Sequence, residues 1–159
     1  MRKPALALIP AASLLLLGAT GPSNPTALAE CRLTHDEVSA GLKDLAVEAP
    51  YGTPDRNRYY STPKDLTVFG FPARSLASYE ASRDGMEALA IMTIASAPYD
   101  QLVATALKQH GLTECEGSNN DGVATCVAMV RREGDWNVGL MFKQVGSETA
   151  MSCGYLRKR

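Results

Sequence analysis

The residues best suited to binding are concentrated in one segment, Tyr51–Tyr60, which is rich in arginine and tyrosine. These two residue types are enriched at binding hot spots because they combine a large contact area with charged or polar tips. A long loop without regular structure in a compact domain is often functional. We therefore expect Arg56, Arg58, Tyr59 and Tyr60 to bind a partner. In the alternative interpretation, the two tyrosines pack beneath the loop and the arginines are solvated.

No group of residues has the pattern of a catalytic site. The chain has only two histidines, His35 and His110, and each lies at an end of an expected helix, where a surface position is the common one. His35 precedes Asp36, but adjacent residues of a helix point in different directions. There is no G-x-S-x-G motif to supply a nucleophile. A hydrolase with a carboxylate or His35 as the base is kept as an alternative function.

Metal and cofactor sites are not indicated by the sequence. The segment Glu116–Gly122 offers oxygen ligands, but its spacing departs from that of the calcium-binding EF-hand and lacks the closing glutamate. No two cysteines have the short spacing of a zinc site. A glycine-rich phosphate loop is also missing. We expect no metal and no cofactor.

The charge balance excludes some partners. The 159 residues include 16 Lys and Arg against 17 Asp and Glu, a formal net charge of −1. A protein that coats nucleic acid or an anionic membrane has a strong excess of positive charge. Another protein is therefore the expected partner, and nucleic acid is not.

The N-terminus has the features of a secretory signal peptide. Arg2 and Lys3 precede an apolar stretch, Ala5–Leu17, and the small-x-small pattern Ala27-Leu28-Ala29 follows. The apolar stretch is shorter than the ~20 residues that span a membrane. We predict that residues 1–29 are cleaved, so that a single domain of residues 30–159 is exported to the periplasm or the medium with no stable membrane insertion. Without Arg2 and Lys3 the domain has 14 basic and 17 acidic residues, a net charge of −3.

All four cysteines lie in the predicted domain. An even number of cysteines in an exported protein indicates disulfides, because the compartment is oxidising. Of the three pairings that four cysteines permit, we favour Cys115–Cys126, across a short Gly/Asn/Asp-rich loop, and Cys31–Cys153, which ties the N-terminus to the last strand.

The periodicity of apolar residues predicts two helices and six strands. A capping box formed by Thr34 and Glu37 starts a helix over 35–46, a long loop covers 47–64, and a second helix begins near Pro98 and ends at Gly111. The chain end Leu156–Arg159 is expected to be a solvated basic tail. The expected strands are 66–71, 76–82, 88–94, 123–131, 136–143 and 149–155.

This order, α-βββ-α-βββ, predicts the α+β class, with an antiparallel meandering sheet and two helices in a two-layer sandwich held by disulfides. A mostly-β roll with peripheral helices is the alternative fold. The leading functional hypothesis is a small exported, non-enzymatic binding or accessory protein, such as an inhibitor or a partner in the cell envelope. A structural envelope component, or a homodimer formed through Tyr79 or an exposed sheet edge, is kept open beside the hydrolase.

Overall fold

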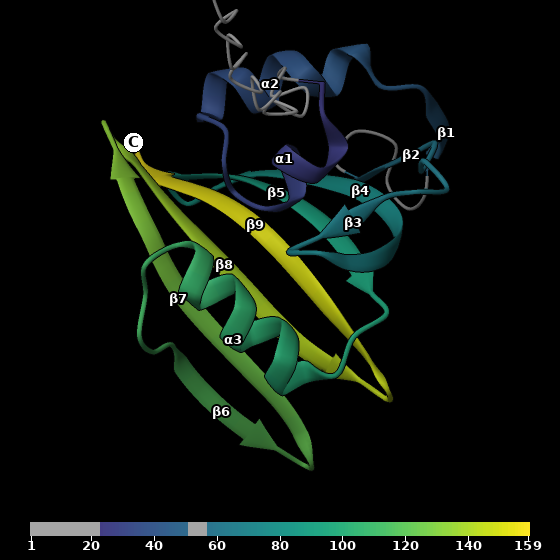
Figure 1. Cartoon of the computed structure of the whole chain (residues 1–159). Coiled ribbons are helices and arrows are strands. Elements are labelled where there is room, and N and C mark those ends of the chain that lie inside the picture. The colour runs from purple at the N-terminus through teal and green to yellow at the C-terminus, as the bar shows by residue number, and fades with distance from the viewer. Residues whose placement is uncertain (1–22, 51–56) are drawn as a thin grey trace, which may run out of the picture.

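The computed structural model describes residues 23–50 and 57–159 (Figure 1). The α+β class is confirmed, but the chain has more elements than the predicted order. In sequence they are α1 (Pro25–Ala29), α2 (His35–Asp44), β1 (Val47–Pro50), β2 (Asn57–Tyr60), β3 (Thr67–Val68), β4 (Phe71–Arg83), β5 (Met86–Ala95), α3 (Tyr99–Gln109), β6 (Glu116–Asn120), β7 (Val123–Glu133), β8 (Trp136–Val145) and β9 (Glu148–Lys158).

A single antiparallel sheet runs through the molecule in the order β1-β2-β4-β5-β9-β8-β7-β6, and β3 pairs with β4 outside this path. The predicted antiparallel meander is therefore correct within each half of the chain. The halves meet where β5 pairs with β9 over ten residues, from Met86 opposite Lys158 to Ala95 opposite Thr149. This central pair joins the first strands of the chain to its last strand (Figure 1).

Alternating side chains give the sheet two different faces. In β8, Val138, Leu140 and Phe142 are fully buried, whereas Met141 between them is 51% exposed. Successive side chains of a strand point to opposite sides, so one face carries the core. We call this face the inner face and the opposite one the outer face. In Figure 1, α1 and α3 lie in front of the inner face.

Two segments that were predicted as irregular form edge strands. The predicted loop 47–64 contains β1 and β2, which pair with each other, and β2 continues the sheet by pairing with β4. The Gly/Asn-rich segment after Cys115 is β6, which pairs with β7. None of these three strands has the long β-branched pattern that identifies a central strand, and the side chains of β6 are all exposed. Both segments are strands because they pair with an existing edge of the sheet, which is a tertiary effect that local sequence does not encode.

The second helix was predicted correctly from local sequence signals, whereas the start of β4 was not. The predicted second helix is α3, whose residues Leu102, Val103, Ala106 and Leu107 are buried. It ends before Gly111, which has a φ of +68°. The interval between the expected strands 66–71 and 76–82 is instead part of β4, with a bulge where Ser75 has a φ of +64° and the register with β5 shifts.

The four cysteines pair as predicted. Cys31 is bonded to Cys153 of β9, with Cα atoms 5.3 Å apart, and Cys115 is bonded to Cys126 of β7, with Cα atoms 5.7 Å apart. The first disulfide ties the segment before α2 to the middle of the sheet. The second fixes the connection from α3 to the edge strand β6.

The basic chain end is ordered, which corrects the predicted solvated tail. β9 continues to Lys158, and the guanidinium groups of Arg157 and Arg159 both contact the carboxylate of Glu87. These hydrogen bonds, from Arg159 first and then Arg157, lower the pKa of Glu87. The ion pairs fasten the end of β9 to the hairpin between β4 and β5.

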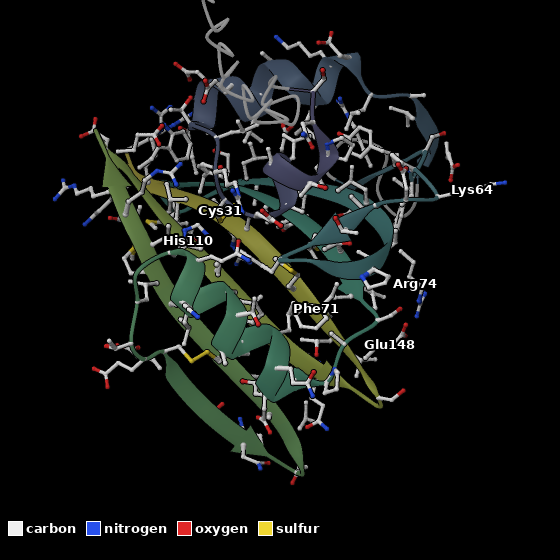
Figure 2. All side chains as sticks on the ribbon, in the orientation of Figure 1. Cys31, Lys64, Phe71, Arg74, His110 and Glu148 are labelled. Carbon is white, nitrogen blue, oxygen red and sulfur yellow. A yellow bond between two sulfur atoms is a disulfide. The ribbon has the colours of Figure 1, made fainter. Side chains whose placement is uncertain are left out.

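An ion pair also closes the other end of the sheet, where Figure 2 shows Arg74 and Glu148 facing each other. Nη2 of Arg74 lies 2.6 Å from Oε2 of Glu148, and Nε lies 3.1 Å from Oε1. The hydrogen bonds from Arg74 lower the pKa of Glu148. β4 is thereby connected to the start of β9 across β5, which lies between them.

Helix α1 belongs to the hydrophobic core. Asn24 caps it by accepting the amides of Thr26 and Ala27 at 3.0 and 3.3 Å. Leu28 and Ala29 are fully buried. The predicted cleavage after Ala29 would remove this helix from the domain, whereas residues 1–22 of the predicted signal lie outside the described part of the chain. No helix in residues 23–50 or 57–159 has the length and apolar character needed to cross a membrane.

We expect Leu28→Ala to lower the free energy of unfolding by about 2–5 kcal/mol, because the smaller side chain leaves a cavity in the core. Leu156→Ala is the matched control: Leu156 is 41% exposed, so its loss should change stability by less than about 0.5 kcal/mol. Urea unfolding of the oxidised, processed protein measures both. Equal stability of Leu28→Ala and wild type would show that α1 is missing from the folded protein, as cleavage after Ala29 requires.

Candidate functional site

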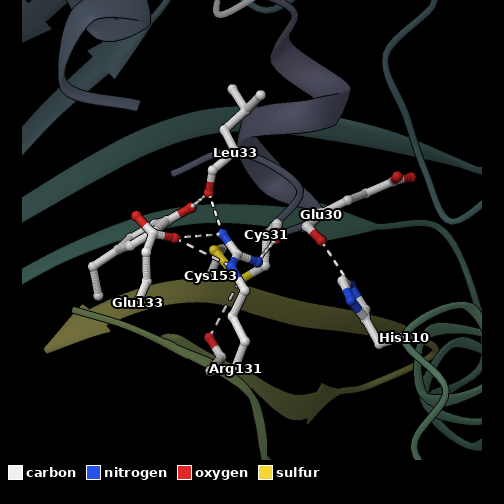
Figure 3. Close-up of a disulfide and its surroundings, with 9 residues drawn as sticks. Glu30, Cys31, Leu33, His110, Arg131, Glu133 and Cys153 are labelled. Carbon is white, nitrogen blue, oxygen red and sulfur yellow. Dashed lines mark hydrogen bonds and ion pairs between the residues drawn. A yellow bond between two sulfur atoms is a disulfide. The ribbon is translucent and has the colours of Figure 1, made fainter. Parts of the chain in front are cut away.

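The segment that joins α1 to α2 is anchored to the sheet, and this anchor places the candidate site (Figure 3). Cys31 is bonded to Cys153 of β9. Arg131 of β7 donates Nη1 to the carbonyl oxygen of Cys31 at 2.5 Å and Nη2 to the carbonyl oxygen of Leu33. One arginine thus satisfies two backbone carbonyls on either side of Arg32, and hydrogen bonds from charged donors are the strong ones.

Two further side chains complete the anchor. The hydroxyl of Tyr155 donates to the Leu33 carbonyl at 2.8 Å, and burial raises the pKa of Tyr155 to about 12, so the hydroxyl keeps its proton as a donor. Glu133 pairs with Arg131 at 3.2 Å and accepts the backbone amide of His35 at 3.0 Å. The first residue of α2 is therefore held against the end of β7.

The predicted capping box fixes the direction of α2. Thr34 Oγ1 accepts the amide of Glu37 at 3.2 Å, and the Glu37 carboxylate accepts the amide of Thr34 at 2.8 Å. The hydrogen bonds from Thr34 lower the pKa of Glu37. The capping box and the anchor together position α2 over the end of the sheet that is formed by β4, β5, β8 and β9.

Between α2 and this end of the sheet lies an open cleft of about 610 Å³. Its lining includes His35, Lys43 and Leu42 from α2 and side chains from five strands, β2, β4, β5, β8 and β9. The register explains the strand side of the cleft, because Ser82 of β4 lies opposite Glu87 of β5, which lies opposite Arg157 of β9. Residues opposite each other in an antiparallel sheet share a face.

Trp136, the only tryptophan of the chain, forms a fixed aromatic wall in the cleft. The ring of His35 stacks on it with centroids 3.8 Å apart and planes inclined by 12°. The guanidinium carbon of Arg157 lies 4.4 Å from the centroid of the Trp136 ring, a cation–π distance. Glu87 holds this guanidinium by ion pairing. The aromatic side chain is therefore preorganised by contacts from α2, β9 and β5.

Three other charged side chains that line the cleft have no ion pair among the described residues: Arg58 of β2, Lys43 in the last turn of α2, and Glu80 of β4. The apolar floor is supplied by Leu42 and Leu89, which are 6% and 5% exposed. The cleft thus combines an aromatic wall, an apolar floor and charges that are available to a ligand. This combination is typical of a binding site.

The arrangement around His35 does not form a nucleophilic dyad. Nδ1 of His35 lies 3.1 Å from Oδ1 of Asp36, and within the described residues the ring makes no hydrogen bond to a serine or to another carboxylate. The part of the chain that the structure describes also contains no group of three metal-ligating His, Cys, Asp or Glu side chains. What the geometry offers is recognition by stacking, charge and apolar contact.

The structure separates the four predicted binding residues. Arg58 reaches the cleft, whereas Tyr59 lies on the outer face and is 39% exposed. Tyr60 is 2% exposed, and its hydroxyl oxygen lies 2.9 Å from Oγ of Ser78. Its burial matches the alternative interpretation and leaves no surface for a partner. Arg56 lies outside the described residues.

Sequence reasoning missed the wall of the cleft. The sequence alone places Trp136 in the expected strand 136–143 and Arg157 in the expected basic tail, and neither assignment indicates a binding wall. Their contact arises because β8 and β9 pair, with Asn137 opposite Leu156. A basic residue next to the last strand and the only tryptophan were the available signals, but neither one fixes the register.

A scan against protein-family models and searches of curated proteins and of solved structures each find no match to this chain.

The anchor gives the protein a dependence on pH through His110. Its Nε2 lies 2.8 Å from the carbonyl oxygen of Glu30 (Figure 3), and burial lowers its pKa below the usual 6.5. Near pH 6.5 and below, the unfolded chain takes up a proton that folded His110 does not, so this contribution to stability is present above pH 6.5 and lost as the pH falls. We expect urea midpoints to decrease between pH 8 and pH 5.5, and His110→Gln to remove part of that decrease.

Three carboxylates do not confound this experiment. Hydrogen bonds lower the pKa values of Glu37, Glu87 and Glu148 from the usual one, so their contributions are lost at more acidic pH. An identical decrease in wild type and His110→Gln would contradict the assignment.

Proposed function

We propose that this protein is a small exported, non-enzymatic binding or accessory protein, and that a partner protein docks at the cleft between α2 and the sheet. The observation that carries the proposal is the fixed Trp136 wall beside Arg58 and Lys43, two cations without an ion pair among the described residues. Tryptophan and arginine are the residue types that dominate binding energy at protein interfaces.

The chemistry of the cleft defines the partner. Arg58 and Lys43 come from β2 and α2, so a carboxylate of the partner placed between these elements meets positive charge. Leu42, Leu89 and the exposed part of Trp136 offer an apolar surface next to these charges. We infer a partner segment that carries an acidic side chain beside an apolar or aromatic one.

Two other features support the proposal. Two disulfides are typical of proteins that work in an oxidising compartment outside the cytosol. The proposal also takes the domain as a two-layer sandwich whose helices share the inner face, so that the helices and the sheet together build a rigid cleft. Binding at such a site costs little conformational entropy, because Trp136 is already held in place.

We expect the double variant Arg58→Glu with Lys43→Glu to lose capture of the partner from the envelope and medium of the exporting cell by about tenfold or more, because it reverses both available cations. The matched control is Lys64→Glu with Lys108→Glu, which makes the same change in net charge at exposed positions outside the cleft. The control should retain capture, and both variants should keep the melting temperature within a few degrees.

A third variant distinguishes the cleft from the rest of the Tyr51–Tyr60 segment. Tyr59→Ala changes a side chain on the outer face and should leave capture intact. Partner binding should change the fluorescence of Trp136, which reports the cleft alone. If the cleft variant and the control lost partner capture equally, the loss would come from the change in net charge. This result would contradict docking at the cleft.

A further inference from the structure

Helix α1 contains the small-x-small motif of the predicted signal peptide, and the fold places this motif in its core. Ala27, Leu28 and Ala29 are 7%, 0% and 0% exposed. In Figure 1, α1 lies in front of β5 and β9, and it contacts both of these strands and β3. A signal peptide is removed before the exported chain folds, so burial does not protect the motif. Burial bears instead on the product, because a chain that begins at Glu30 has to fold without these side chains.

The loss of α1 would remove several core side chains at once. Truncation of one buried leucine already costs the transfer free energy of the missing atoms and the cost of the cavity that they leave. Cleavage after Ala29 would remove Leu28, two further buried side chains and their backbone together. Because native domains are only marginally stable, we expect that a chain that begins at Glu30 does not keep this fold.

The polar contacts of Glu30 are those of a residue inside the chain, not of a chain end. Glu30 is 3% exposed, and its amide donates to the carbonyl oxygen of Thr26 at 2.9 Å. Its carboxylate accepts the amide of Phe69 and lies 2.5 Å from Nε of Arg32, and its carbonyl oxygen accepts from His110 (Figure 3). After the cut, the amide would become an ammonium group that has lost its acceptor. The carboxylate would lose the apolar cover of α1, and water weakens such ion pairs.

Helix α1 also supports the segment that places the cleft. The hydroxyl of Thr26 donates to the carbonyl oxygen of Thr67 of β3 at 2.8 Å. The amide of Arg32 donates to the carbonyl oxygen of Ala27 at 3.3 Å. The first hydrogen bond fastens α1 to the strands, and the second fastens the segment around Cys31 to α1. A protein without α1 would lose this side of the support.

Small residues are also present upstream of α1. Ala19, Gly21 and Ser23 follow Leu17, the last residue of the apolar stretch, and are closer to it than the motif in α1 is. A signal peptide is cut at a small residue that follows its apolar region. Asn24 is the N-cap of α1. Cleavage after any of these three residues therefore leaves the cap and the whole helix in the processed protein.

We propose that the exported chain is cleaved after Ala19, Gly21 or Ser23, and that the processed protein keeps Asn24 and α1. The inference rests on the proposed export. The reaction is the hydrolysis of one peptide bond, in which water gives the signal peptide a new carboxyl group and the protein a new amino group. The alanines of α1 then serve packing, since small side chains let the helix lie close to the sheet.

The test is the first residue of the processed protein. The full chain is produced in the exporting cell, and the exported, oxidised protein is analysed by intact mass spectrometry and N-terminal sequencing. We expect the chain to begin at Thr20, Pro22 or Asn24. A chain that begins at Glu30 would overturn the inference, and so would any other first residue, including Met1.

Two variants test the cleaved bond directly. We expect Ala19→Gln with Gly21→Gln and Ser23→Gln to lower the yield of processed protein by about tenfold or more and to accumulate the full-length chain, because the cut requires a small residue. The matched control, Thr20→Gln with Pro22→Gln, changes the residues between these positions and keeps all three small residues. It should be processed like the wild type. Normal processing of the triple variant would also overturn the inference.

The outcomes separate this inference from the proposed function. A first residue of Glu30 shows that the chain is exported and that the inferred cleavage site is wrong. A full-length chain that stays in the cell and begins at Met1 removes export from the proposed function and overturns the inference with it. Partner capture by the cleft variants remains a separate measurement, so docking at the cleft can fail while the cleavage site is confirmed.

Discussion

Arg131 and the Cys31–Cys153 disulfide hold the segment between α1 and α2 against the sheet, and the rest of the structure depends on this attachment. The segment has no regular structure, so its carbonyl groups need partners from elsewhere in the chain. Arg131 and Tyr155 supply those partners, and Glu133 accepts the first amide of α2. The same attachment keeps α1 in the core and places His35 on Trp136. A local connection thereby couples the N-terminal helices to the strands that form the cleft.

The sequence was informative wherever a short-range rule decides the structure. The capping box of Thr34 predicts the correct helix start, the apolar periodicity predicts the strand that begins at Trp136, and the favoured cysteine pairing is the one observed. The sequence was less informative for β1, β2 and β6, because these segments become strands only by pairing at an edge of the sheet. The wall of the cleft depends on the register between strands distant in sequence, which brings Arg157 to Trp136. Of the predicted binding residues that the structure describes, Arg58 reaches the cleft and Tyr59 does not, because β2 is a strand and successive side chains point to opposite faces.

The two faces of the sheet differ in character. The inner face is covered by apolar side chains from the helices and is open to a ligand at the cleft beside α2. The outer face has an apolar centre and charged residues beside it.

The central claim is that the attachment by Arg131 positions α2, and with it the cleft. Amide hydrogen exchange in wild type and Arg131→Gln, with both disulfides intact, tests it most directly. The account predicts that the amides of α2, His35–Asp44, exchange about tenfold faster or more in the variant, while those of the central strands β5 and β9 keep their protection. Unchanged exchange in α2 would contradict the claim, because α2 would then be held by contacts that do not involve Arg131.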